Sequence, residues 1–195
     1  MNLTLLYSII YEGENMVYLY TDLTKKGFSD YQIKKMVNEN KLYVVKKGIY
    51  SDKLNYNYLE VIAVKHPNAV FTLETAAYCY GLISKNKIPY VIATKQKDRK
   101  IKDEYIKQIF TTDKLYNTGI SKITYQGFNI LIYDLERLLI DVVRNKKNMD
   151  FESYHEIINN YKRISKLLNK NKLNEYIINF KDPKIVDRIK REVLS

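Results

Sequence analysis

The sequence has few of the residues that form disulfides or bind structural metals. Its 195 residues include one cysteine, Cys79, and two histidines, His66 and His155. A single cysteine cannot form an internal disulfide, and these three residues do not have the spacing of a zinc site. We therefore expect a protein without an internal disulfide and without a bound metal.

Long apolar runs and targeting signals are also missing. No run of about 18 apolar residues is present, so no membrane-spanning helix is predicted. The N-terminus has neither the basic lead nor the small-residue cleavage site of a signal peptide. The expected location is the cytoplasm, and no membrane partner is expected.

The common catalytic and nucleotide-binding motifs are absent. The sequence contains no GxGxxG, GxxxxGK[ST] or HExxH pattern, and no Ser-His-Asp arrangement can be argued from it. Asp134, Glu136 and Asp141 lie close together and could indicate a metal-dependent nuclease. Asp134 fits better as a helix cap, however, and Glu136 fits better in a surface or interdomain ion pair. We therefore predict no catalytic residue and no cofactor, and a protein that is not an enzyme.

What the sequence has in excess is positive charge. The net charge is +11 and the pI is about 9.4. Residues 1–84 hold nine Lys and Arg against eight Asp and Glu, whereas residues 85–195 hold twenty-four against fourteen. Such a basic surface attracts polyanions, so nucleic acid is the leading candidate partner. An A·T-rich genome, which enriches the codons of Lys, Asn, Ile and Tyr, is the alternative explanation.

The first 52 residues have the order of elements of a winged helix-turn-helix. Residues 3–11 are largely apolar and predict a helix, and residues 18–20 are β-prone. A short helix that ends at Gly27 follows, with Thr21 or Asp22 as its N-cap.

The next segment completes this pattern. Ser29 can cap a helix that runs to about Asn40. The β-prone runs 42–45 and 48–50 then predict a hairpin with a basic tip at Lys46-Lys47-Gly48. In a winged helix-turn-helix, the second helix of the helix-turn-helix pair enters the major groove of DNA.

The helix after Ser29 has an apolar side and a polar side. Ile33, Met36 and Val37 are spaced to face inward. Asn and Gln on the opposite side can bond adenine edges, Lys can bond guanine or phosphate, and Tyr can bond phosphate. The candidate DNA-binding residues are Ser29, Tyr31, Gln32, Lys34, Lys35, Asn38, Lys46 and Lys47.

The rest of the chain predicts a mixed domain, so the expected fold class is α+β. Strands are predicted at 70–72, 89–94, 105–111, 120–125 and 128–133, with a hairpin turn at Gln126-Gly127. Helices are predicted at about 74–80, with Thr72 as the N-cap, and from Asp134 onward, with N-caps at Asp134, Asp150 and Asp182 and one helix over about 165–178. The expected divisions are a DNA-binding domain over 1–52, a helical connection with the start of the second domain over 53–84, and an α+β domain with C-terminal helices over 85–195.

A second group of cations follows the strand predicted at 89–94. These residues could neutralise DNA phosphates from the second domain, or they could be a solvated loop. They are Lys95, Lys97, Arg99, Lys100 and Lys102.

Three stretches carry a resemblance to a known family: Leu42–Tyr50, His66–Leu82 and Tyr133–Arg144. In these stretches the chain resembles the AbiEi antitoxins, which belong to bacterial abortive infection and to type IV toxin-antitoxin systems. Family members often have Ser-His before the helix predicted at about 74–80, where this chain has Phe71-Thr72. The family's recognition helix usually carries Arg, whereas Lys dominates here, so the operator sequence cannot be inferred.

The resemblance implies a transcriptional repressor that regulates its own operon. Its winged helix-turn-helix would bind double-stranded promoter DNA, with an inverted repeat as the expected operator. Residues 85–195 would counteract a co-encoded nucleotidyltransferase-like toxin, in phage defence and without requiring a stable complex. Two alternatives remain open: a nucleic-acid-processing enzyme with a winged-helix targeting domain, and a transcriptional regulator with a partner-binding second domain and no toxin.

Overall fold

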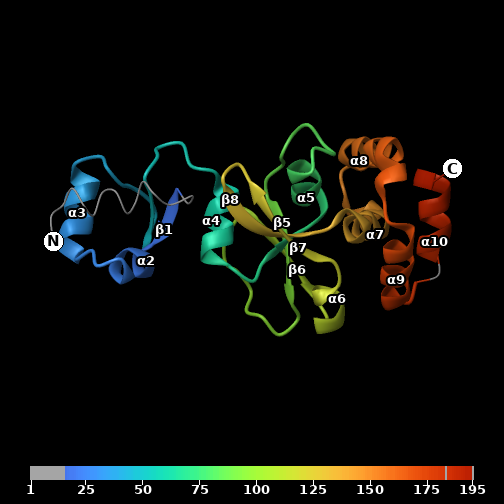
Figure 1. Ribbon diagram of the computed structural model, residues 1–195, viewed down its shortest axis with the longest axis horizontal. Coiled ribbons are helices and arrows are strands. Elements are labelled where there is room, and N and C mark those ends of the chain that lie inside the picture. Colours follow the sequence, from blue (N-terminus) through green and yellow to red (C-terminus); the bar gives the residue numbers. More distant parts are fainter. Residues whose placement is uncertain (1–15, 183, 195) are drawn as a thin grey trace. The chain divides into compact units, whose positions relative to one another are not determined.

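The computed structural model describes residues 16–182 and 184–194, so the helix expected at 3–11 lies outside the described residues. The described chain is a mixed α+β protein with two small sheets, which confirms the expected class (Figure 1). Its contacts divide it into two compact units. Among the described residues, the first consists of those up to Pro67 together with Thr124–Ile130, and the second consists of Asn68–Ile123 and those from Leu131 onward.

The first unit contains a small antiparallel sheet and three described helices. Its elements are, in order, β1 (Val17–Leu19), α2 (Tyr20–Lys25), α3 (Asp30–Asn38), β2 (Tyr43–Lys46), β3 (Ile49–Ser51) and α4 (Tyr58–Lys65). The strand order is β1-β3-β2, so β3 is central and pairs with both neighbours. The pairing of β2 with β3 has an irregularity between Val44 and Lys46.

Helices pack on both faces of this sheet, because its strands carry apolar residues on alternate sides. Tyr18 and Tyr50 are cross-strand neighbours that pack with the apolar residues of α2 and α3. Val17 and Ile49 pack on the other side with Val61 of α4. The sheet therefore holds α3 on one face and α4 on the other.

A buried carboxylate joins α4 to the start of β1. Glu60 is 0% exposed, and its Oε1 accepts bonds from the backbone N–H groups of Met16 (2.6 Å) and Val17 (2.9 Å). Burial raises the pKa of the Glu60 carboxyl above its ordinary value, although these two hydrogen bonds oppose the shift. The Glu60 side chain thus accepts hydrogen bonds from two backbone N–H groups that would otherwise have no partner where β1 begins.

The larger sheet has five strands in the order β6-β5-β4-β8-β7. They are β4 (Val70–Phe71), β5 (Tyr90–Lys95), β6 (Ile106–Thr111), β7 (Ile120–Tyr125) and β8 (Phe128–Tyr133). β4 pairs antiparallel with β5 and parallel with β8, and β5 pairs parallel with β6. The five expected strands are therefore present and form one sheet.

The turn between β7 and β8 is the one expected at Gln126-Gly127. Both residues have positive φ, 49° and 89°, as a type I′ hairpin turn requires. Asn57 Nδ2 donates a hydrogen bond of 2.8 Å to the Gln126 side chain. By its contacts, this hairpin end belongs to the first unit.

The second unit is otherwise helical. Its helices are α5 (Leu73–Cys79), α6 (Asp113–Asn117), α7 (Leu135–Asn145), α8 (Phe151–Ile164), α9 (Lys170–Phe180) and α10 (Lys184–Ile189), with short turns η1 (Lys146–Asn148), η2 (Ser165–Leu167) and η3 (Lys190–Leu194). Helices α7 to α10, orange to red in Figure 1, gather together. Residues 138–143 of α7 are all buried, so this helix forms the centre of the group.

Four of the expected caps are present and two differ. The side chains of Ser29, Asp134 and Asp150 cap α3, α7 and α8, and Asp182 accepts a 3.1 Å bond from the N–H of Lys184, the first residue of α10. The prediction of Thr21 or Asp22 as an N-cap is wrong, because α2 begins earlier: Leu19 stands at the N-cap and Asp22 accepts a bond of 3.2 Å from the Leu19 N–H. Thr72 stands at the N-cap of α5 but makes no cap bond.

Candidate nucleic-acid interface

Helix α3 begins with a reciprocal pair of hydrogen bonds. The Gln32 N–H donates to Ser29 Oγ at 3.3 Å, and the Ser29 N–H donates to Gln32 Oε1 at 2.8 Å. This capping box fixes the helix start at Asp30, because it satisfies two backbone donors that the helix itself leaves unpaired. The oxygen of the Gln32 side chain is therefore used inside the helix start.

The two sides of α3 are as the sequence predicts. Ile33 and Met36 are 2% and 0% exposed, and the half-buried Val37 packs against the same cluster. The opposite side is the recognition face, which we define as Tyr31, Lys34, Lys35 and Asn38. These positions follow one another at helical spacing, so their side chains form one stripe.

The recognition face is accessible to solvent. Tyr31 is 75% exposed, Lys34 and Asn38 are exposed, and Lys35 is half-buried. Lys35 Nζ lies 3.8 Å from Glu39 Oε1. A surface ion pair of this kind contributes at most about 1 kcal/mol, so it does not prevent Lys35 from bonding a phosphate.

The two lysines at the hairpin tip differ in their surroundings. Lys46 Nζ donates to the Tyr58 hydroxyl of α4 and lies 5.0 Å from the centre of that ring. Lys47 is exposed at the hairpin turn. The carbonyl of Gly48, which has φ of 76°, accepts a 2.8 Å bond from the Tyr20 N–H, so the turn is tied to the start of α2.

Tyr20 is a residue of this surface that the sequence analysis did not identify. It is 38% exposed, and its hydroxyl donates to the carboxylate of Asp30, the first residue of α3. This bond raises the pKa of the Tyr20 hydroxyl. The contact joins two helices across ten residues, and no local sequence signal predicts it.

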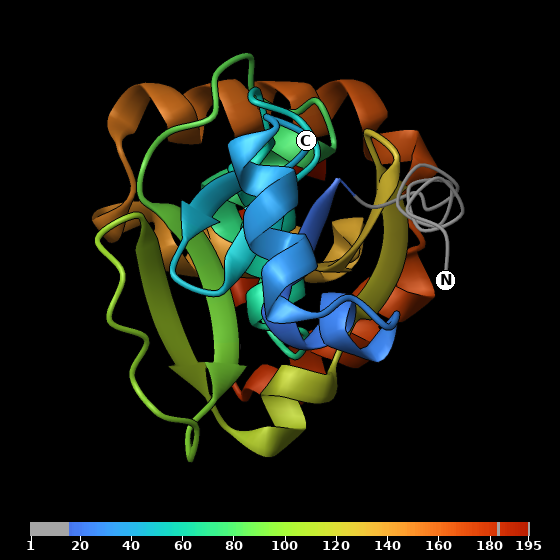
Figure 2. The ribbon, with the colours of Figure 1, turned by 90° about the vertical axis from the view of Figure 1, so that its left-hand side faces the viewer.

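The middle of the basic segment of the second unit is bonded to the side chain of Gln108. The connection from β5 to β6 has no helix and runs back beside β6 (Figure 2). Gln108 of β6 accepts from the Ile101 N–H at 2.7 Å and donates to Thr94 Oγ1 at 2.8 Å and to the Arg99 carbonyl at 3.2 Å. The middle of the connection is therefore fixed to the sheet.

The five cations of this segment do not form one cluster. Lys95 Nζ lies 5.4 Å from the centre of the Tyr116 ring, and Lys97 lies 3.8 Å from the Asp113 carboxylate. Arg99, Lys100 and Lys102 are exposed. These three lie at or beside the residues whose backbone Gln108 holds, Arg99 and Ile101.

The three carboxylates that could suggest a nuclease have other contacts. Asp134 caps α7, and Glu136 accepts a 2.8 Å bond from the Asn169 N–H. Lys172 lies 3.0 Å from Asp134 and 3.7 Å from Glu136. Asp141 pairs with Arg137. Within residues 16–182 and 184–194, no three His, Cys, Asp or Glu side chains are grouped to hold a metal ion.

The helices of the described chain are also too short or too polar for a lipid bilayer. None of them combines the length and the apolar character that crossing a membrane requires.

Comparisons with known proteins identify a similar fold. No protein-family model matches the sequence, and no curated protein matches it. The structure is similar to the crystal structure of the RV2827C protein from Mycobacterium tuberculosis, with a TM-score of 0.69 and 12% sequence identity. The match covers 96% of this chain and 74% of that chain. At this identity the similarity shows a shared fold alone.

Proposed function

We propose that this protein is a transcriptional repressor and antitoxin of the AbiEi type. It binds its own promoter through an N-terminal winged helix-turn-helix and counteracts a co-encoded nucleotidyltransferase-like toxin. The order β1, α2, α3, β2, β3 supports the winged-helix assignment, because that motif consists of a helix-turn-helix followed by a hairpin. The resemblance of the three sequence stretches supports the antitoxin assignment.

The observation that carries the DNA-binding proposal is the exposed recognition face of α3. Buried Ile33 and Met36 hold the helix by its opposite side, so the face can enter a major groove without unfolding anything. Asn38 suits an adenine edge, and Lys34 and Lys35 suit guanine acceptors or phosphates. Tyr31 suits a backbone phosphate.

The hairpin contributes less than the sequence suggests. Lys46 is engaged with Tyr58, so Lys47 is the hairpin cation that faces solvent. In this proposal Lys47 contacts the DNA backbone beside the groove. Lys46 stabilises the hairpin by bonding Tyr58 of α4.

A promoter-binding assay with charge-reversed proteins tests this proposal. The test protein carries Lys35→Glu and Lys47→Glu, and the matched control carries Lys53→Glu and Lys65→Glu, two exposed lysines of the same unit. Both change the net charge equally. We expect the first pair to abolish retention of the promoter fragment in a gel-shift assay at moderate salt, and the second pair to leave most of it.

Unchanged affinity of the Lys35→Glu, Lys47→Glu protein for the promoter would refute the proposal that the recognition face binds DNA. Equal losses in both proteins would show that net charge alone drives binding. Circular dichroism of each protein verifies that the fold is retained.

The second unit can extend the DNA footprint through Arg99, Lys100 and Lys102. Each phosphate neutralised steepens the dependence of log K on log salt by about 0.9. Replacing the five cations of the segment by Ser should flatten this slope if the exposed ones contact phosphates. An unaltered slope would restrict the footprint to the first unit.

The antitoxin part of the proposal is tested by co-expression. The adjacent open reading frame is expected to encode a nucleotidyltransferase-like protein that arrests growth when expressed alone. Co-expression of this protein should restore growth, and the Lys35→Glu, Lys47→Glu protein should restore it too if a separate promoter drives the toxin gene. Continued arrest with the unaltered protein would refute the antitoxin assignment without affecting the repressor assignment.

A further inference from the structure

The second unit contains a cavity of about 390 Å³ that the proposed function does not use. Its walls come from β5, β6, α7 and the residues at the ends of α5 and α9. The residues that matter for its chemistry are Phe110, Thr112, Arg137, Asp141, Arg144 and Phe180. The volume lies in the range of about 300 to 1,000 Å³ that small-molecule sites occupy.

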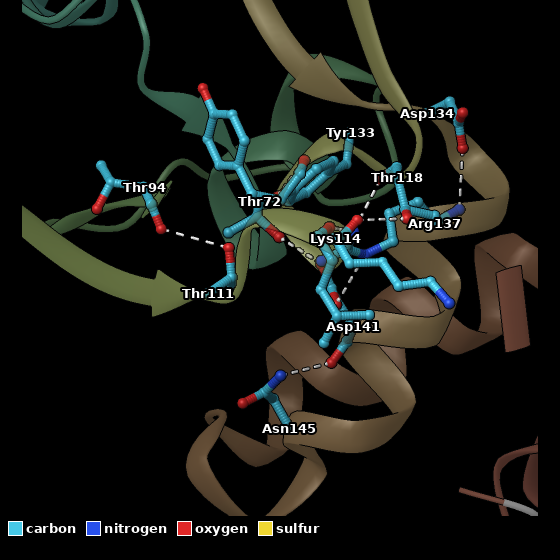
Figure 3. Close-up of polar contacts among 12 residues, drawn as sticks. Thr72, Thr94, Thr111, Lys114, Thr118, Tyr133, Asp134, Arg137, Asp141 and Asn145 are labelled. Carbon is cyan, nitrogen blue, oxygen red and sulfur yellow. Dashed lines mark hydrogen bonds and ion pairs between the residues drawn. The ribbon is translucent and has the colours of Figure 1, made fainter. Parts of the chain in front are cut away.

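One wall of the cavity is formed by a buried ion pair whose two charges neutralise each other. Arg137 is 1% exposed, and its Nε donates to Asp141 Oδ1 at 3.2 Å (Figure 3). Its Nη1 donates to the carbonyls of Leu115 and Thr118, the second at 2.8 Å. Thr72 Oγ1 donates to the other oxygen of Asp141 at 3.1 Å. This wall therefore presents a preorganised polar surface with little net charge.

Arg144 differs from Arg137 in making no hydrogen-bonded ion pair within the described chain, although its charge helps to lower the pKa of the nearby Asp141 carboxyl. It lies on the same side of α7, one turn beyond Asp141, and its side chain is exposed. Its guanidinium lies 4.6 Å from the centre of the Phe180 ring. Among the residues that the structure describes, it makes no ion pair. The ring contact orients the guanidinium, and its five N–H donors remain for a ligand.

A hydroxyl and a second aromatic ring complete the arrangement. Thr112 is exposed at the start of α6, and its side chain makes no cap bond there. Phe110 is 43% exposed, which is unusual for an apolar ring on a strand. The cavity thus combines an oriented guanidinium, a hydroxyl donor and aromatic surface.

We propose that this cavity binds a mononucleotide. The guanidinium of Arg144 holds the phosphate, because its planar fork matches two phosphate oxygens. Thr112 donates to the same group. The base occupies the space beside Phe110, since aromatic side chains stack on any base. The site is independent of the recognition face, and it does not depend on the protein being a repressor.

Isothermal titration calorimetry with the full chain tests the site. The probes are ATP, GTP, CTP and UTP, their monophosphates, the corresponding nucleosides and inorganic phosphate. We expect at least one nucleotide to bind at least ten-fold more tightly than its nucleoside and than inorganic phosphate. No binding by any nucleotide, or equal affinity for nucleotide and inorganic phosphate, would overturn the proposal.

Two single substitutions provide the matched comparison. Arg144→Gln removes the proposed phosphate ligand, and Lys147→Gln removes the same charge from an exposed residue outside the cavity lining. Loss of a charge-assisted hydrogen bond should weaken nucleotide binding about ten- to hundred-fold in the first protein, with no change in the second. Equal weakening in both proteins would show non-specific attraction to the basic surface and would overturn the site.

A third protein tests the site without removing a charge. Thr112→Val deletes the exposed hydroxyl and preserves the shape of the side chain. We expect a smaller loss of nucleotide affinity than in Arg144→Gln, and unchanged affinity for the promoter fragment. An unchanged nucleotide affinity would refute the role of Thr112, and equal losses of nucleotide and promoter affinity in Arg144→Gln would assign the arginine to DNA instead.

Discussion

The buried pair of Arg137 and Asp141 permits a quantitative test of how the second unit is stabilised. Replacing Arg137 by Met removes the cation while keeping most of the apolar volume. Asp141 then keeps only its bond from Thr72, and the carbonyls of Leu115 and Thr118 lose their donor. Removing one partner of a buried pair costs about 3–5 kcal/mol, because it leaves an uncompensated charge.

The double replacement should cost much less than the sum of the single ones. Asp141→Leu alone leaves Arg137 buried with its two carbonyl acceptors and two ring contacts, to Tyr133 at 3.9 Å and Phe180 at 4.7 Å. When both residues are replaced, neither charge of this pair remains. We expect the double-mutant cycle to give a coupling free energy of about 2–3 kcal/mol.

The stability cost of Arg137→Met should also depend on pH, which gives a second check on the same pair. Burial raises the pKa of the Asp141 carboxyl, and the Arg137 guanidinium opposes that shift. In Arg137→Met the largest opposing contribution is lost, and only those of Thr72 and Arg144 remain, so the folded-state pKa rises further above the unfolded value. Ionisation then destabilises the fold as pH rises above about 4. The cost of Arg137→Met should therefore be smaller at pH 4 than at pH 7.

Hydrogen exchange of peptides from α7 is the appropriate measurement, because it reports on the second unit even if the two units unfold separately. Urea denaturation, monitored by circular dichroism, measures the free energy of unfolding of the whole protein. Additive costs in the cycle, or a cost of Arg137→Met below about 1 kcal/mol at pH 7, would refute the view that this pair is buried and coupled.

Three further predictions concern the first unit. Ser29→Ala should destabilise α3 by about 1 kcal/mol through loss of the cap, measured as faster exchange of the α3 amides. Met36→Ala should lower the free energy of unfolding by about 2–5 kcal/mol, measured by urea denaturation, with Lys34→Ala as an exposed control on the same helix. Glu60→Gln keeps an acceptor for the N–H groups of β1 but removes a carboxyl whose pKa burial raises. The unaltered protein should therefore lose stability relative to Glu60→Gln as pH rises above about 4.3, and parallel profiles of urea midpoint against pH would contradict this.

The elements that the sequence predicted correctly depend on neighbouring residues. Ser29, Asp134 and Asp150 cap their helices because each side chain bonds a backbone N–H three residues later. The Gln126-Gly127 turn is equally local, since two residues with positive φ are enough to define it. The two sides of α3 follow from periodicity alone.

The predictions that failed or were missing depend on distant partners. Thr72 does not cap α5, because its hydroxyl donates to Asp141, 69 residues away in sequence. The helix expected from about residue 165 begins instead at Lys170, where the N–H of its cap residue Asn169 donates to Glu136, 33 residues away in sequence. The engagement of Lys46 by Tyr58 likewise needs the folded sheet, and so the candidate interface could be predicted in outline but not residue by residue.

The composition of the first unit affects how the protein can be dissected. Because Thr124–Ile130 belongs to that unit, the polypeptide enters it twice. A protein ending at Pro67 would lack the residue that accepts the side-chain hydrogen bond of Asn57, the N-cap of α4. Truncation after Pro67 would thus damage the unit it was meant to isolate, whereas point substitutions in the intact polypeptide leave both units complete.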